Sequence, residues 1–184
     1  MLSDSSYMNW LNEMEASTSV YTGQVRGCAP RCVATIMKYL DLADSSAMDI
    51  VLKAAIPLSG GIIQSYNICG ALLGGIMAIS ISLLREKKEE EASRDEIMTL
   101  NHQCREYYRR FEKEIGHARC FDIRQVGLGR CFDTADPDDY EKFVKAGGHD
   151  FCAKVIGKAA RLAVESILET NPSLKNIIIT KKEQ

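Results

Sequence analysis

The sequence lacks the short motifs that identify many common enzymes. It contains no Gly-x-Ser-x-Gly motif and no phosphate-binding loop, so no standard hydrolase or nucleotide-enzyme motif is present. No Cys-x-x-Cys pair occurs, which counts against thioredoxin-like and zinc-ribbon proteins. Histidine is scarce. The three histidines, His102, His117 and His149, have no paired metal-ligand spacing. His117 and His149 lie three residues before Cys120 and Cys152, so hydrogen bonding to a centre there is an alternative, but we expect solvated loop residues.

An excess of positive charge is also lacking. The formal net charge of the 184 residues is -2, so no basic face for nucleic acid is indicated and we expect no nucleic-acid partner. Residues 1–8 contain neither a basic n-region nor an apolar h-region, so we expect no signal peptide and a cytoplasmic protein. The odd cysteine count of seven argues against a fully paired secreted framework.

No hydrophobic run is a good candidate for crossing a membrane. Residues 58–84 form an uncharged segment that is long enough to span a membrane, but Gly60 and Gly61 interrupt it. The continuous part, residues 68–84, is marginal in length. We therefore expect a buried central helix and no membrane insertion.

The sequence does contain repeated helical patterns and no convincing strand alternation. It predicts an all-α protein, a compact bundle of about six helices around a central Gly-rich apolar helix at residues 68–85. We expect one domain over residues 1–184, with an N-terminal helix and linker at 1–24 and a flexible C-terminal tail at 172–184. The segment after Gly116, which contains Gly127 and Gly129, is predicted to be a loop.

Four of the seven cysteines share a predicted setting that favours a thiolate. Cys28, Cys69 and Cys152 fall at or beside predicted helix N-termini, where free N–H groups and the helix dipole favour negative charge. Cys120 follows Gly116, the predicted end of a helix, and has His117 and Arg119 close to it in sequence. Such thiolates suit metal ligation or nucleophilic chemistry. The alternative for each one is a small buried apolar residue.

The other three cysteines are less easily assigned. Cys32 lies four residues after Cys28, on one helical face with it, so it suits a second ligand, a dithiol or the core. Cys131 lies in a predicted loop after Gly129 and fits no core pattern. Cys104 falls on a hydrophobic helical stripe, which indicates packing.

The order of these motifs resembles that of the C-GCAxxG-C-C family of redox-active proteins. The resemblance runs from about Gly27 to Leu168. Its elements are Gly27-Cys28-Ala29, the Gly60-Gly61 turn, Cys69-Gly70-Ala71-Leu72-Leu73-Gly74, Phe111 and Gly116 ahead of Cys120, and Asp136-Pro137 with Tyr140 ahead of Cys152.

This resemblance implies that the four family cysteines are Cys28, Cys69, Cys120 and Cys152. A related domain of split-Soret cytochromes is associated with an iron–sulfur centre. This chain has no Cys-x-x-Cys-His, so covalent haem is not expected. Cys32 and Cys131 look like additions to the family pattern, and we expect at least one of them close to the centre as an additional ligand.

Three functions remain open at this point. The first is an iron–sulfur protein for electron transfer or redox sensing, with the four family cysteines as ligands and an unknown redox partner protein. The second is a thiol–disulfide oxidoreductase that attacks with Cys28 or Cys32 and contains no metal. The third is a structural zinc or interaction domain. Each is compatible with a homodimer.

Overall fold

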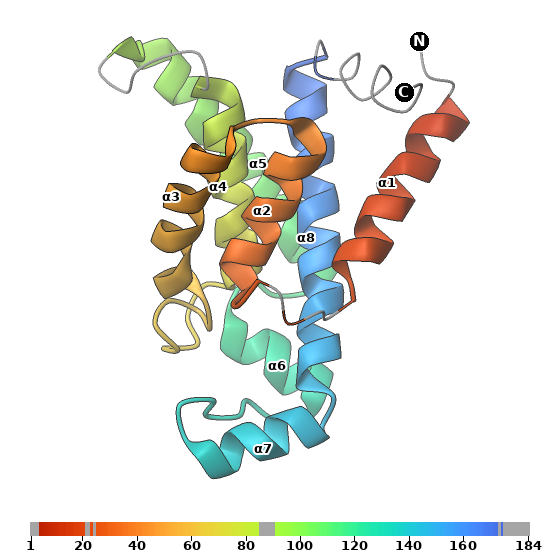
Figure 1. Cartoon of the computed structure of the whole chain (residues 1–184), viewed down its shortest axis with the longest axis vertical. Coiled ribbons are helices and arrows are strands. Elements are labelled where there is room, and N and C mark those ends of the chain that lie inside the picture. Colours follow the sequence, from red (N-terminus) through yellow and green to blue (C-terminus); the bar gives the residue numbers. More distant parts are fainter. Residues whose placement is uncertain (1–3, 21–22, 24, 85–90, 173, 175–184) are drawn as a thin grey trace.

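The computed structural model describes residues 4–20, 23, 25–84, 91–172 and 174, and the regular structure in that part is helical (Figure 1). The predicted all-α class is confirmed. The elements in chain order are α1 (Asp4–Thr18), α2 (Cys28–Leu40), α3 (Ser45–Ala55), the short 3-10 helix η1 (Ile56–Leu58), α4 (Gly70–Leu84), α5 (Arg94–Ile115), α6 (Cys120–Leu128), α7 (Pro137–Lys145) and α8 (Gly148–Thr170).

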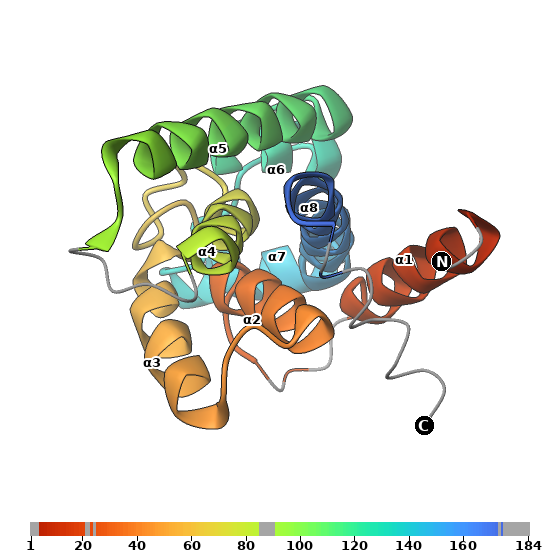
Figure 2. The ribbon, with the colours of Figure 1, turned by 90° about the horizontal axis from the view of Figure 1, so that it is seen from above.

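The core lies where α2, α4, α5 and α8 meet. Seen from above, α4 and α8 lie between α5 on one side and α2 on the other (Figure 2). Val33 and Ile36 of α2, Leu72 and Ile79 of α4, and Val164 of α8 are fully buried at these contacts. The predicted central helix is therefore present as α4.

Glycines in α4 let its neighbours approach closely. A β-carbon at Gly74 would lie 2.5 Å from the carbonyl oxygen of Ala29 in α2. The ring of Tyr107 from α5 occupies the space that a side chain at Gly75 would need. The Tyr107 hydroxyl then donates a hydrogen bond of 3.2 Å to the Ala159 carbonyl of α8. These two glycines serve tight helix packing.

The helices differ in how their first turns are capped. The side chains of Asp44, Ser93 and Asp136 accept backbone N–H hydrogen bonds at the starts of α3, α5 and α7. No side-chain cap hydrogen bond is made at the starts of α2, α6 and α8. Figure 1 shows that α2 and α8 begin at the end of the molecule that carries α6 and α7. Uncapped N–H groups therefore gather at that end.

Two expectations about the elements need correction. The segment predicted to be a loop contains α6, and the described part of the chain has eight α-helices where about six were expected. The helix was missed because it is only nine residues long, contains Gly127 and begins without a capping side chain. The tail predicted at 172–184 lies almost wholly outside the described residues. Among the described helices, none is long and apolar enough to cross a membrane.

Candidate functional site

A short antiparallel bridge places two of the predicted cysteines side by side. The bridge pairs the residue before Cys69 with the residue before Cys120. The Cys69 N–H donates to the Ala118 carbonyl at 2.9 Å, and the Cys120 N–H donates to the Asn67 carbonyl at 2.6 Å. Helix α4 starts directly after Cys69, and α6 starts at Cys120. Both thiols are buried at this junction.

The third cysteine reaches this pair because α4 begins with a glycine. Cys28 is the first residue of α2. Its sulfur lies so close to Gly70 that a β-carbon at Gly70 would overlap it. Gly27 supplies a φ of +91°, which few other residues adopt, and so sets the entry into α2. In the Cys69–Gly74 motif, Gly70 makes room for the Cys28 sulfur and Gly74 for the α2 backbone.

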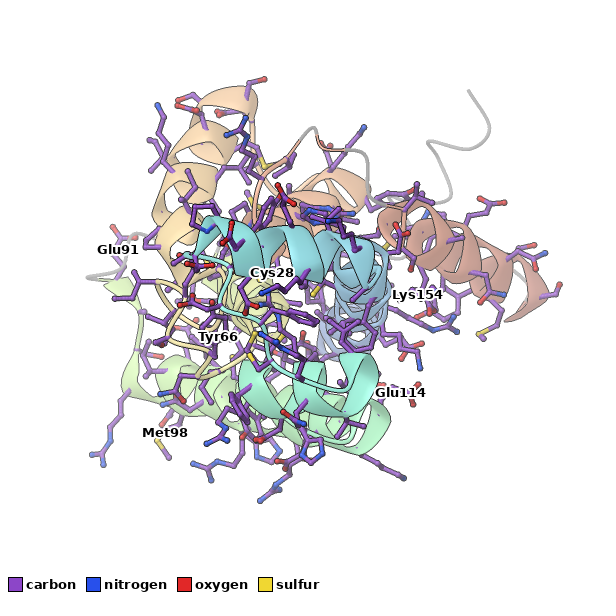
Figure 3. All side chains as sticks on the ribbon, turned by 90° about the horizontal axis from the view of Figure 1, so that it is seen from below. Cys28, Tyr66, Glu91, Met98, Glu114 and Lys154 are labelled. Carbon is purple, nitrogen blue, oxygen red and sulfur yellow. The ribbon has the colours of Figure 1, made fainter. Side chains whose placement is uncertain are left out.

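Cys152, near the start of α8, completes the group. It interacts electrostatically with Cys28 and with Cys120. All four cysteines line one cavity of about 550 Å³. Figure 3, which looks onto the end that carries α6 and α7, shows Cys28 in the middle of that end. The fold thus gathers the four family cysteines, each from or beside a different helix, around one space.

Burial controls the protonation of these thiols. It raises the pKa of Cys69 well above the usual value, although N–H groups of Leu72 and Ala71 lower it by donating to the sulfur. Burial also raises the pKa of Cys120 to about 12, with Arg124 acting in the opposite direction. The pKa of Cys152 is raised for the same reason. These thiols hold their protons at neutral pH unless a metal displaces them.

Arg124 is a site residue that the sequence did not identify. Its side chain lines the cavity, yet the residue is only 8% exposed. The guanidinium lies over the Phe143 ring, with 4.6 Å to the centroid, and over the Tyr66 ring, with 5.4 Å. Its positive charge lowers the pKa of both Cys120 and Cys152, against the effect of burial. Arg124 lies four residues after Cys120, and this spacing places both residues on one face of a helix. The spacing could have identified Arg124 only if α6 had been predicted as a helix.

One of the three histidines also belongs to the cavity wall. His149 lines the cavity, and its Nε2 lies 3.0 Å from the Tyr140 hydroxyl in a hydrogen bond. Its ring packs edge-on against Phe143 at 5.3 Å. Burial lowers the pKa of His149, which favours the neutral ring. His102 and His117 are exposed, but His149 is half-buried within α8, so the expectation of a solvated loop residue is wrong for His149.

A left-handed turn forms another part of the wall. Residues 60–64 have φ values from +45° to +73°, and two of them, Ile62 and Ile63, are β-branched. Such residues rarely adopt positive φ, and strain of this kind concentrates at functional sites. The Tyr66 N–H closes the turn with a 3.0 Å hydrogen bond to the Gly60 carbonyl. Ser59, at the start of the turn, and Gln64, within it, line the cavity.

The remaining three cysteines lie outside the described cavity lining. Cys32 is fully buried in the core against Gly74. Cys131 is partly buried, and the Arg124 charge lowers its pKa as it lowers that of Cys152, although burial raises both. Cys104 packs partly buried against the core from α5, as its stripe position predicted. A ligand role for Cys32 or Cys131 stays a prediction.

Within the described residues, no three Cys, His, Asp or Glu side chains are placed so that they could hold a metal ion. All seven cysteines are unpaired.

These features define an all-α, cysteine-rich protein with four thiols around one cavity. A family profile described as "Putative redox-active protein (C_GCAxxG_C_C)" matches residues 27–166, and the chain belongs to this family. The predicted family assignment is therefore confirmed. No curated protein and no solved structure shows a significant match to the chain.

Proposed function

We propose that the protein binds an iron–sulfur cluster through Cys28, Cys69, Cys120 and Cys152 and serves electron transfer or redox sensing. The observation that carries this proposal is that these four thiols line one cavity of about 550 Å³. Four cysteine thiolates are the usual ligand set for both two-iron and four-iron clusters. The cavity size also lies in the range of small-molecule and cofactor sites.

The surroundings fit a negatively charged group. Helices α2 and α6 begin at ligand cysteines without a side-chain cap, so their N–H groups and dipoles favour negative charge there. Arg124 adds a buried positive charge beside Cys120 and Cys152. When bound, a cluster would supply one-electron chemistry. The chain's own residues would hold it, shield it from water and offset its charge.

A thiol–disulfide oxidoreductase without metal is the second candidate. The contact of the Cys28 sulfur with Gly70 favours it, because this contact brings two cysteines of adjacent helices together. The protonation of the other thiols counts against it. An attacking cysteine needs a thiolate near neutral pH, whereas burial raises the pKa of Cys32, one of the two thiols predicted to attack, as well as the pKa values of Cys69, Cys120 and Cys152.

Visible absorbance and metal analysis of anaerobically purified protein separate the candidates. The proposal predicts a brown protein with charge-transfer absorbance that contains iron and acid-labile sulfide. A colourless protein with one zinc per chain would support a structural zinc domain. A colourless protein with no metal, and with thiols that cycle with a disulfide substrate, would support the oxidoreductase.

The proposal also bears on location and partners. Seven unpaired cysteines suit a reducing compartment, so we expect the protein to act in the cytoplasm. Its redox partner would be another protein. A pull-down from anaerobic lysate, compared between the iron-loaded protein and a variant without the four cysteines, would test whether a partner depends on the centre.

A further inference from the structure

The charge around the cavity is one-sided. Among the described residues that line it, Arg26, Arg31 and Arg124 are arginines and none is an aspartate or a glutamate. The whole chain has a net charge of -2, so this excess does not follow from composition. A cleft lined by one sign of charge attracts small ions of the opposite sign.

Two buried polar groups of the wall lack a hydrogen-bond partner. They are Arg124 Nε and Ser59 Oγ. Arg124 is more than nine-tenths buried, and a buried guanidinium N–H without an acceptor is costly. Both residues line the cavity, so an acceptor placed there could satisfy them. The chemistry that suits a guanidinium best is an oxyanion, because its planar fork matches two oxygens.

The cavity is open to solvent at one side and closed at the other. Its lining includes exposed residues, Arg26, Gln64 and Tyr140, as well as the buried Cys69 and Cys120. A small molecule can therefore reach the thiols from the surface. A protein that only transfers electrons to another protein does not need such an opening.

We propose that the cavity binds a small oxyanion, a carboxylate or a tetrahedral anion such as phosphate, on Arg124 beside the cysteine centre. This deepens the proposed function by naming the class of small molecule that the centre acts on or senses. Its redox meaning rests on that function. The binding itself depends on Arg124 and Ser59, and Arg26 at the mouth attracts the anion.

Calorimetric titration tests the proposal on the purified chain and on the iron-loaded protein. Sodium phosphate and sodium acetate are the two probes, with sodium chloride keeping the ionic strength constant. We expect saturable binding of one probe to both forms, and the probe that binds tells tetrahedral anion from carboxylate. Arg124→Lys keeps the charge but loses the fork, so binding should weaken about tenfold.

Two further variants control the result. Arg26→Gln removes an exposed charge at the mouth of the cavity. It should weaken binding, but less than Arg124→Lys does. It tests the site even if Arg124→Lys fails to fold. Arg109→Gln removes an exposed arginine of α5 that pairs with Glu106, outside the cavity lining, and should bind the probe like the unmodified chain.

The outcomes distinguish this proposal from the proposed function. Oxyanion binding by a chain that takes up no iron would support the site and refute the cluster. An iron-loaded protein that binds neither probe would support the cluster and overturn the oxyanion site, with the arginines then serving the cluster alone. Equal affinity of the unmodified chain, Arg124→Lys and Arg26→Gln would also overturn it.

Discussion

Gly70 determines where the sulfur of Cys28 can lie, because it leaves the space that this sulfur occupies. The sulfur contacts the start of α4 directly, and this contact brings α2 to the Cys69–Cys120 junction. The site therefore requires glycine at position 70 as well as the cysteines themselves.

Gly70→Ala should displace the Cys28 sulfur. We expect a loss of about 1–3 kcal/mol in the free energy of unfolding, because the added methyl overpacks a filled space, and a loss of most of the bound iron. Denaturant unfolding and iron analysis measure both effects. Gly129→Ala is the control. Its methyl meets open space at a φ of +79°, so it costs stability but should keep the iron. Equal iron in both variants would contradict this role of Gly70.

The cysteines should separate into ligands and packing residues. Cys69→Ala should abolish the centre, since Cys69 lies at the start of α4 in the cavity wall. Cys104→Ala should leave it intact, because Cys104 packs against the core from α5. Visible absorbance after anaerobic reconstitution measures the difference. A folded Cys104→Ala protein that had lost its absorbance would show that this ranking is wrong.

Cys32 and Cys131 test how far the four-cysteine pattern suffices. Neither is among the described cavity-lining residues, so Cys131→Ser should keep the iron content and spectrum of the unmodified chain. Cys32→Ala should cost about 1 kcal/mol through the small cavity it creates in the core, again with the iron retained. The double variant Cys32→Ser with Cys131→Ser checks both at once. A shifted spectrum would instead make one of them an additional ligand, as the sequence suggested.

At the scale of elements, the starts of helices matter most. Those of α3, α5 and α7 are capped by their own side chains, whereas those of α2 and α6 carry cysteines and remain uncapped. Long helices with strong periodicity, such as α5 and α8, were predictable from the sequence. Helix α6 was not, since nine residues with a weak pattern carry little local signal. The left-handed turn at 60–64 was not predictable either, because isoleucine disfavours positive φ and gives no local signal for such a turn.

The segment that joins α6 to α7 should depend on pH through Asp139. Its carboxylate accepts the Asp133 N–H and pairs with Arg130, and these contacts, led by the backbone hydrogen bond, hold its pKa below the usual value. A lowered pKa in the folded state means stabilisation that is complete above the unfolded pKa, about 3.9, and is lost as the pH falls through the folded pKa.

The matched variant is Asp139→Asn. It should be less stable than the unmodified chain at pH 7, and the difference should shrink as the pH falls below about 4. Thermal unfolding followed at several pH values measures this. A difference that stayed constant down to pH 2 would show that the carboxylate charge is not what stabilises this segment.

At the scale of the whole molecule, the fold collects groups that are far apart in the sequence. Family resemblance and helix-end chemistry were enough to nominate the four cysteines. They could not show that the four line one cavity, since that depends on how α2, α4, α6 and α8 pack. Arg124 was missed for the same reason, because its burial against Phe143 and Tyr66 is a tertiary fact. The all-α class followed from local periodicity alone.

We propose that the four thiols of the cavity together hold one iron–sulfur centre. The most direct test is iron and acid-labile sulfide per chain after anaerobic reconstitution, in the unmodified protein and in a variant with Cys28, Cys69, Cys120 and Cys152 all changed to serine. We expect stoichiometric iron and sulfide in the unmodified protein and neither in the variant, with circular dichroism showing helix in both. Stoichiometric zinc without iron in the unmodified protein, or equal iron in the two proteins, would contradict it.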